Sequence, residues 1–267
     1  MSVNLRVSRR ARLVAVLPLV AVLAGCEMSV GNLAGRATDE WTHTYPLAAG
    51  GEIEIVNTNG RIDVEGVEGS TLEVRAERIA RAATDAGARE LLPRIVIKED
   101  VKPDHVRLET ERISGFMIGA GIEVRYHVRA PKSASVHVTN TNGQVAASAL
   151  SGTLFAHTTN GSINAKAIAG PVDAQTTNGN VTVDLASVAG KVSVKTTNGG
   201  LVLTVPGDAK ADLSASCTNG GIDVSGLKLD TTESSRRHIE GTLNGGGTAI
   251  ELHTTNGGIH VRSRSAA

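Results

Sequence analysis

Residues 172–183 read Val-Asp-Ala-Gln-Thr-Thr-Asn-Gly-Asn-Val-Thr-Val, and this pattern recurs along the second half of the chain. With Asn178 as position zero, apolar residues occupy positions −6, −4, +3 and +5. Side chains on a strand alternate between two faces, so each half of the pattern predicts a short strand with one apolar face. The Asn-Gly between the halves predicts a tight turn with a left-handed glycine.

The triplet Thr-Asn-Gly repeats, with spacings of 18, 18, 20 and 21 residues through the middle of the chain, and all seven copies carry apolar residues at the same four positions. Further glycines, Gly152, Gly170 and Gly190, mark a second turn in each repeat. Identical residues can stack in register only if neighbouring coils run parallel. The repeat therefore predicts an all-β fold, a parallel β-solenoid of two-strand coils, rather than an antiparallel meander.

Two inward-facing rows are expected next to the turns. The alternation places position −2 and the asparagine itself on the same side as the apolar residues. Position −2 holds small, mostly hydrogen-bonding residues: Asn57, Asn140, Thr158, Thr176, Thr196, Cys217 and Thr254. The asparagines are predicted to form a buried structural ladder: Asn142, Asn160, Asn178, Asn198, Asn219 and Asn256.

Two segments interrupt the repeat. Residues 71–130 predict inserted strands and a short helix from Ile79 to Leu92, which Pro93 ends. Within this insertion, Phe116, Met117 and Ile118 form an apolar loop tip between glycines. Such a tip is either a contact site for a partner or a cap on the first end of the solenoid. Residues 227–247 are interpreted as a surface excursion before the last coil.

The N-terminus has the features of an export signal. Four arginines precede the apolar run Leu13 to Ala24, which is too short to span a membrane. The following Leu23-Ala24-Gly25-Cys26 resembles the lipobox of bacterial lipoproteins, in which the cysteine carries diacylglycerol. Residues 1–25 are thus expected to be a signal peptide, and Cys26 the lipidated N-terminus. By the same resemblance, Glu27 implies sorting to the outer membrane in a Gram-negative cell.

The remaining chain is divided into residues 26–48, a lipidated N-terminus and linker; 49–262, the solenoid domain; and 263–267, a tail. With Cys26 lipidated, Cys217 is the only other cysteine, so no internal disulfide is expected. The predicted membrane contact is through the lipid anchor alone.

Three motifs carry a resemblance to a known family: the opening Gly50 to Gly60, the Arg-Ala-Pro at Arg129 to Pro131, and Thr254 to Ile259. Across roughly Trp41 to Arg262, the chain resembles a bacterial envelope family named "putative adhesin", a domain of unknown function with a β-helical fold. The resemblance implies binding at the cell surface. Its motifs are structural and bring no catalytic residue with them.

Enzymatic, metal-binding and nucleic-acid-binding functions have little support in the sequence. Removal of the basic leader leaves a slightly acidic chain without a basic patch for nucleic acid. Polysaccharide-cleaving β-helices use stacked carboxylates, whereas Asp173, Asp184, Asp223 and Glu251 are isolated at outward positions. No catalytic residue, cofactor site or metal-ligand spacing is predicted, because the eight histidines are mostly single.

The sequence therefore favours a non-catalytic envelope lipoprotein. Its rigid β-helical surface would serve as an adhesin-like binding or scaffold module for an unknown envelope protein or glycan. The alternative is a carbohydrate-active β-helix enzyme. A cleft lined by converging carboxylates would favour the enzyme, and a flat solenoid face with an exposed apolar tip would favour the binding module.

Overall fold

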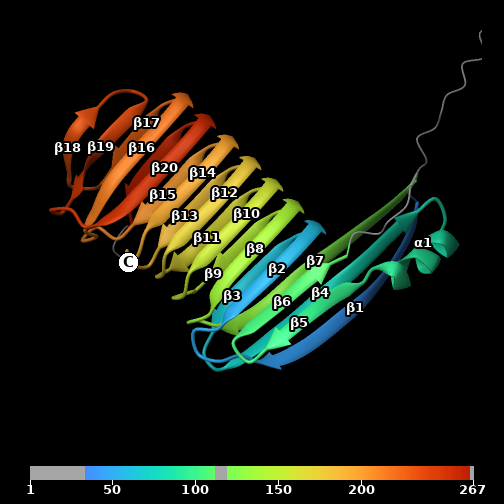
Figure 1. Ribbon diagram of the computed structural model, residues 1–267. Coiled ribbons are helices and arrows are strands. Elements are labelled where there is room, and N and C mark those ends of the chain that lie inside the picture. Colours follow the sequence, from blue (N-terminus) through green and yellow to red (C-terminus); the bar gives the residue numbers. More distant parts are fainter. Residues whose placement is uncertain (1–33, 112–118, 265–267) are drawn as a thin grey trace, which may run out of the picture. The chain divides into compact units, whose positions relative to one another are not determined.

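The computed structural model describes residues 34–111 and 119–264, which form two β-sheets and one short α-helix (Figure 1). The two sheets, called sheet A and sheet B, enclose a shared apolar core. Within the described residues, no helix is long and apolar enough to cross a membrane.

Each coil contributes one strand to each sheet, and the Asn-Gly turn joins the two strands. The coil strands of sheet B are β2 (Glu52–Asn59), β8 (Ser135–Asn142), β10 (Leu154–Asn160), β12 (Val172–Asn178), β14 (Val192–Asn198), β16 (Ala211–Asn219) and β20 (Thr248–Asn256). Those of sheet A are β3 (Ile62–Val67), β9 (Val145–Ser148), β11 (Ile163–Ile168), β13 (Val181–Leu185), β15 (Leu201–Val205), β17 (Ile222–Ser225) and β21 (Ile259–Ser263).

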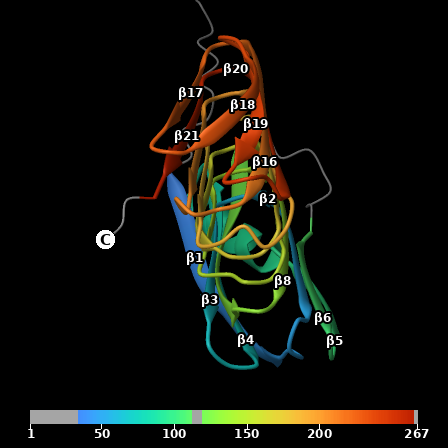
Figure 2. The same ribbon diagram turned by 90° about the vertical axis from the view of Figure 1, so that its left-hand side faces the viewer.

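Neighbouring coils pair parallel and in register, so that equal repeat positions lie side by side. Asn178 of β12, for example, pairs with Asn160 of β10 and with Asn198 of β14. The predicted parallel β-solenoid of two-strand coils is confirmed. Seen along the stack, the coils form a narrow loop around the core (Figure 2).

The order of the coils in space differs from their order in the chain. The last coil, β20–β21, lies between β14–β15 and β16–β17 (Figure 1). At the other end, β2–β3 lies between β8–β9 and the strands β6 (His105–Thr110) and β7 (Ala120–Pro131). At both ends, therefore, a coil from elsewhere in the chain is inserted within the parallel stack.

Antiparallel strands extend the first end of both sheets. Sheet A continues from β7 to β4 (Thr71–Ala82) and then to β1 (Gly35–Pro46), while sheet B ends with β5 (Ile97–Lys102) beside β6. Tyr45 of β1 connects the two edges, because its hydroxyl donates to Glu99 Oε2 on β5 over 2.6 Å. Burial, together with this hydrogen bond, raises the pKa of Tyr45.

Two predictions about this end are wrong. The helix α1 spans Asp85–Leu91, followed by the 3-10 turn η1 (Leu92–Arg94), and does not begin at Ile79. Residues up to Ala82 belong to β4, which pairs with strands on both sides, and this pairing overrides local helix preference. The expected linker over residues 26–48 contains β1, whose partner strand β4 is distant in the chain.

The excursion predicted for residues 227–247 is instead part of sheet B. Its strands β18 (Leu229–Ser234) and β19 (His238–Leu243) form an antiparallel hairpin beside β16. The turn of this hairpin also reaches the edge of sheet A, where the Ile222 N–H donates to the Arg236 carbonyl. The hairpin therefore covers part of an edge that would otherwise expose unpaired backbone groups.

The core is built from the predicted apolar positions. All are buried except Ile222 and Val224, which lie on the terminal strand β17. Tyr126 fills the first end of the core, with its hydroxyl 2.8 Å from Thr110 Oγ1. Burial raises the pKa of Tyr126 to about 12, so its hydroxyl stays neutral at physiological pH.

The turn glycines are required by space, and most of them also by a positive φ. A Cβ on Gly179 would lie 2.1 Å from the Gly161 carbonyl oxygen, and the other turn glycines meet their neighbours in the same way. Gly179 also has a φ of 158°, a positive value that L side chains rarely adopt, in agreement with the predicted turn glycine. The Gly161 N–H donates to the Asn178 carbonyl over 2.9 Å, which holds these two turns close together.

We predict that Gly179→Ala lowers the free energy of unfolding by about 1–3 kcal/mol, since the new methyl group forces adjacent turns apart. Gly200→Ala is the matched control, because a Cβ there meets no atom nearer than 3.5 Å. Thermal unfolding monitored by circular dichroism measures both variants. Equal melting temperatures for the two would contradict the close-approach explanation.

Candidate functional site

Two sets of predicted site residues lie outside the described residues. These are the lipidation residue Cys26 and the loop-tip residues Phe116, Met117 and Ile118. The candidate surfaces below are therefore built from the coils and from the hairpin that extends sheet B.

The asparagines form a continuous hydrogen-bonded row along the turns. The Nδ2 of Asn178 donates to the Oδ1 of Asn160 over 2.8 Å, and the Oδ1 of Asn178 accepts from Asn198 over the same distance. The row continues through the other coils, joining Asn59, Asn142, Asn256 and Asn219.

This row is exposed, so the predicted burial of the six asparagines is wrong: Asn142, Asn160, Asn178, Asn198, Asn219 and Asn256. The alternation of faces holds through Thr176, which is buried. Thr177 and Asn178 are both exposed, because the chain already bends into the turn there and strand parity no longer applies.

A second row, at position −2, is buried as predicted, and it fixes the turns from inside. The Thr176 hydroxyl donates to the Gly161 carbonyl over 2.9 Å, and Thr196 and Thr254 make equivalent bonds to the adjacent coil. Cys217 occupies the same row and is buried. Each turn is thus held to the next by an outer row of amides and an inner row of mostly hydroxyl groups.

A shallow groove of about 510 Å³ runs along the outer face of sheet B beside the turns. It crosses β8, β10, β12, β14 and β20. One side carries the residues of position −3, which are Thr139, His157, Gln175, Lys195 and His253. The other side carries the threonines of position −1, which are the exposed Thr159, Thr177 and Thr197 and the partly exposed Thr255. The predicted outward orientation of His157 and His253 agrees with this lining. The groove offers hydrogen-bond donors and acceptors at the regular strand spacing of about 4.8 Å.

An aromatic residue lies beside this groove. Phe155 is only partly buried, and its ring lies between His137 and His157, with centroid separations of 5.4 Å and 3.7 Å. Phe155 was not singled out from the sequence. The available signal was its position, −5 relative to Asn160, where the alternation directs a side chain outward.

Sheet A has a hollow of about 610 Å³ on its outer face. Ala146 and Ser148 of β9 are small, while Asp63 on one side and Lys166 on the other have longer side chains. Asp63 is already paired, with Arg61 Nε at 2.6 Å and His127 Nδ1 at 3.4 Å. Glu65, Arg129 and Lys166 also line the hollow, so its walls carry charges of both signs.

The family model described as Toastrack DUF4097 matches residues 49–262. The chain belongs to this family. A "putative cell adhesion protein" from Clostridium sporogenes has a similar structure, with 14% identity, a TM-score of 0.50, and coverage of 85% of this chain and 100% of that chain. A "putative adhesin" from Bacteroides fragilis is 10% identical with a TM-score of 0.28, over 85% of this chain and 97% of that one. Among curated proteins, none matches the chain.

In this DUF4097 protein, the four outward carboxylates considered as catalytic candidates do not meet. Asp184 pairs with Arg264 at 2.7 Å and Glu251 with Lys191 at 2.7 Å, on opposite sheets. Asp173 lies two strands from Glu251, with Ser193 between them, and Asp223 lies near His260 on sheet A. Each carboxylate has its own partner, as on a solvated strand face.

The hairpin β18–β19 brings together three side chains that the sequence did not connect: Glu233, His238 and Glu240. They lie in the stretch without repeat periodicity, so no face could be assigned to them. The available signal was the short turn between the two strands, which places Glu233 opposite Glu240. His238 lies two residues before Glu240 on the same strand, so both side chains are on the same face.

We predict that Asn178→Ala lowers the free energy of unfolding by about 0.5–1.5 kcal/mol, since it breaks two amide hydrogen bonds in the exposed row. Thr177→Ala, at the exposed neighbouring position, should change it by less than about 0.5 kcal/mol. Chemical denaturation measures both variants. A larger loss for Thr177→Ala would show that the amide row contributes little to stability.

Proposed function

We propose that this DUF4097 protein is a lipid-anchored envelope protein that acts as a non-catalytic, adhesin-like binding scaffold. The observation that supports binding most directly is the outer face of sheet B. There the in-register coils hold exposed polar side chains in a continuous groove beside a partly exposed phenylalanine.

The proposed anchor is Cys26, and its support comes from the sequence. The basic start, the short apolar run and the small residues before Cys26 together fit a lipoprotein signal. Each CH₂ group of an acyl chain buried in a bilayer contributes about 0.8 kcal/mol, so two or three chains attach a protein firmly. Outer-membrane sorting is part of the same proposal and rests on Glu27.

The groove has the chemistry of a contact surface for a polar partner. Threonine hydroxyls and imidazoles both donate and accept hydrogen bonds, and Phe155 adds apolar area next to them. Parallel pairing fixes the positions of these groups before a partner binds. Little conformational entropy is therefore lost on association. An envelope protein or an envelope glycan would fit this surface.

The alternative, a carbohydrate-active β-helix enzyme, requires carboxylates that converge on a substrate. Asp173, Asp184, Asp223 and Glu251 instead bind separate partners on two faces. The binding scaffold is therefore the better account of these residues.

For the anchor, we predict that Cys26→Ala moves the protein from the membrane fraction to the soluble fraction, or leaves it unprocessed. Cys217→Ala is the matched control, since it removes the other cysteine, which is buried in the core. Fractionation and intact-mass measurement read out both variants. A mature protein with an unmodified Cys26 thiol would refute the anchor.

For the binding face, we predict that Thr177→Arg weakens binding of the Cys26→Ala protein to isolated envelopes by at least tenfold, about 1.4 kcal/mol. The arginine obstructs the groove from an exposed position. Thr182→Arg makes the same change on the outer face of sheet A in the same coil, and it should leave binding unchanged.

Co-sedimentation with envelopes measures this binding. Loss of binding after protease treatment of the envelopes identifies a protein partner, and retained binding identifies a glycan. If Thr182→Arg loses binding while Thr177→Arg retains it, the contact surface lies on sheet A and the proposed face is wrong.

A further inference from the structure

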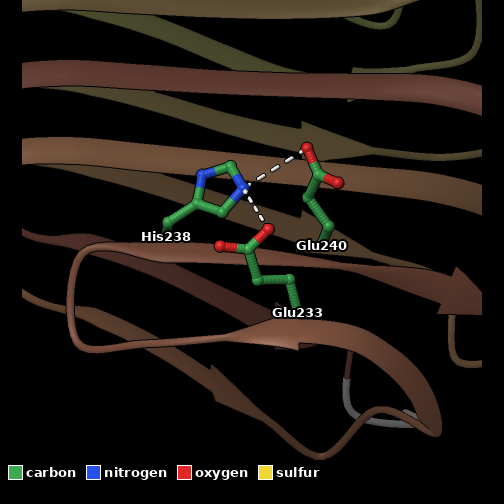
Figure 3. Close-up of side chains that lie close together, drawn as sticks. All are labelled: Glu233, His238 and Glu240. Atoms are coloured by element: carbon green, nitrogen blue, oxygen red, sulfur yellow. Dashed lines mark ion pairs between the residues drawn. The ribbon is translucent and has the colours of Figure 1, made fainter.

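The hairpin β18–β19 gathers three potential metal ligands on one face (Figure 3). His238 Nε2 lies 3.3 Å from Glu240 Oε1 and 3.7 Å from Glu233 Oε2, and the three donor atoms all lie within 4.8 Å of one another. Both carboxylates point toward the same imidazole nitrogen (Figure 3). Three donors thus surround one small volume at the protein surface.

The two glutamates of this cluster lie directly opposite each other, an arrangement that is unfavourable for like charges. Glu40 and Glu77 form a comparable opposite pair on sheet A, but there Arg75 contacts Glu40 and Arg36 contacts Glu77. Among the described ion pairs of Glu233 and Glu240, the basic partner is His238. The pair therefore lacks the arginine counterions found elsewhere, and it meets a side chain that is itself a metal ligand.

We propose that Glu233, His238 and Glu240 bind a divalent cation of the zinc type. One imidazole nitrogen with two carboxylate oxygens suits zinc and similar transition metals, whereas calcium and magnesium prefer oxygen ligands alone. A tetrahedral zinc ion with bonds of about 2.0–2.2 Å needs donor atoms roughly 3.3–3.6 Å apart. The His238–Glu240 and His238–Glu233 separations are close to this range, and the exposed Glu233 side chain is free of packing constraints.

A cation bound at this site would hold the two strands of the hairpin together. Glu233 belongs to β18, whereas His238 and Glu240 belong to β19, so one cation would cross-link the two strands at the edge of sheet B. Ser214 of the adjacent β16 places its hydroxyl 3.5 Å from Glu240 Oε1, next to the ligand set. Three protein ligands leave at least one coordination position open to water or to a partner's ligand. This site depends neither on the lipid anchor nor on the groove of sheet B.

Isothermal titration of zinc into the full chain tests the site, with the protein purified without a histidine tag and freed of metal by a chelator. We expect one equivalent to bind and the melting temperature to rise with zinc concentration, because the ion binds the folded state. Magnesium at the same concentration should produce no shift. His238→Gln and Glu240→Gln should each weaken zinc binding at least about tenfold, since even loss of an outer-shell partner of a metal ligand has an effect of this size.

His260→Gln is the matched control, because His260 has one carboxylate neighbour, Asp223 at 3.9 Å. It should bind zinc as the parent does. Circular dichroism of the metal-free variants checks that all of them fold alike. The proposal is overturned if the parent does not bind zinc, if both hairpin variants bind it unchanged, or if His260→Gln loses binding to the same extent.

Discussion

The close contact between turns of adjacent coils is the constraint on which the rest of the structure depends. Each turn glycine lies against the carbonyl of its neighbour, where a Cβ would come within 1.9–2.1 Å. This approach locks the coils in register, and register in turn aligns apolar positions inside and polar positions outside. The amide row and the hydroxyl row then form as consequences, because equal residues arrive side by side.

The two ends show how a parallel stack is closed. A parallel ladder exposes backbone groups at its terminal strands, and such edges promote association between molecules. The hairpin β18–β19 pairs antiparallel with β16 and cannot continue the repeat, so it terminates sheet B. Insertion of β20–β21 inside the stack gives the last coil of the chain neighbours on both sides. The less regular β16–β17 coil is left at the end, where Ile222 and Val224 are only partly buried.

Periodic features could be predicted from the sequence, and features that depend on non-local pairing could not. The apolar positions and the buried row at position −2 follow from strand alternation, and the parallel coils follow from the repetition of identical residues. Alternation failed at Asn178 because the chain bends one residue before it. The extent of β4 depends on its partners β1 and β7, and the place of β20 depends on strands far away in sequence. Among the candidate site residues, Phe155 could be placed from the repeat, but Glu233, His238 and Glu240 lie outside it.

Packing fixes the inward positions of each coil, so differences between coils at outward positions carry the functional information. At position −5 the neighbouring coils hold His137, Phe155, Asp173, Ser193 and Glu251 in one row. Apart from the buried Ser193, the residues of this row are partly exposed, and a strand face in contact with water accepts many polar residues. The Phe155 ring in this row packs between two histidines, and its remaining exposed area is available for contact with a partner. The least repetitive part of an otherwise repetitive surface is therefore the place where specific binding should be sought first.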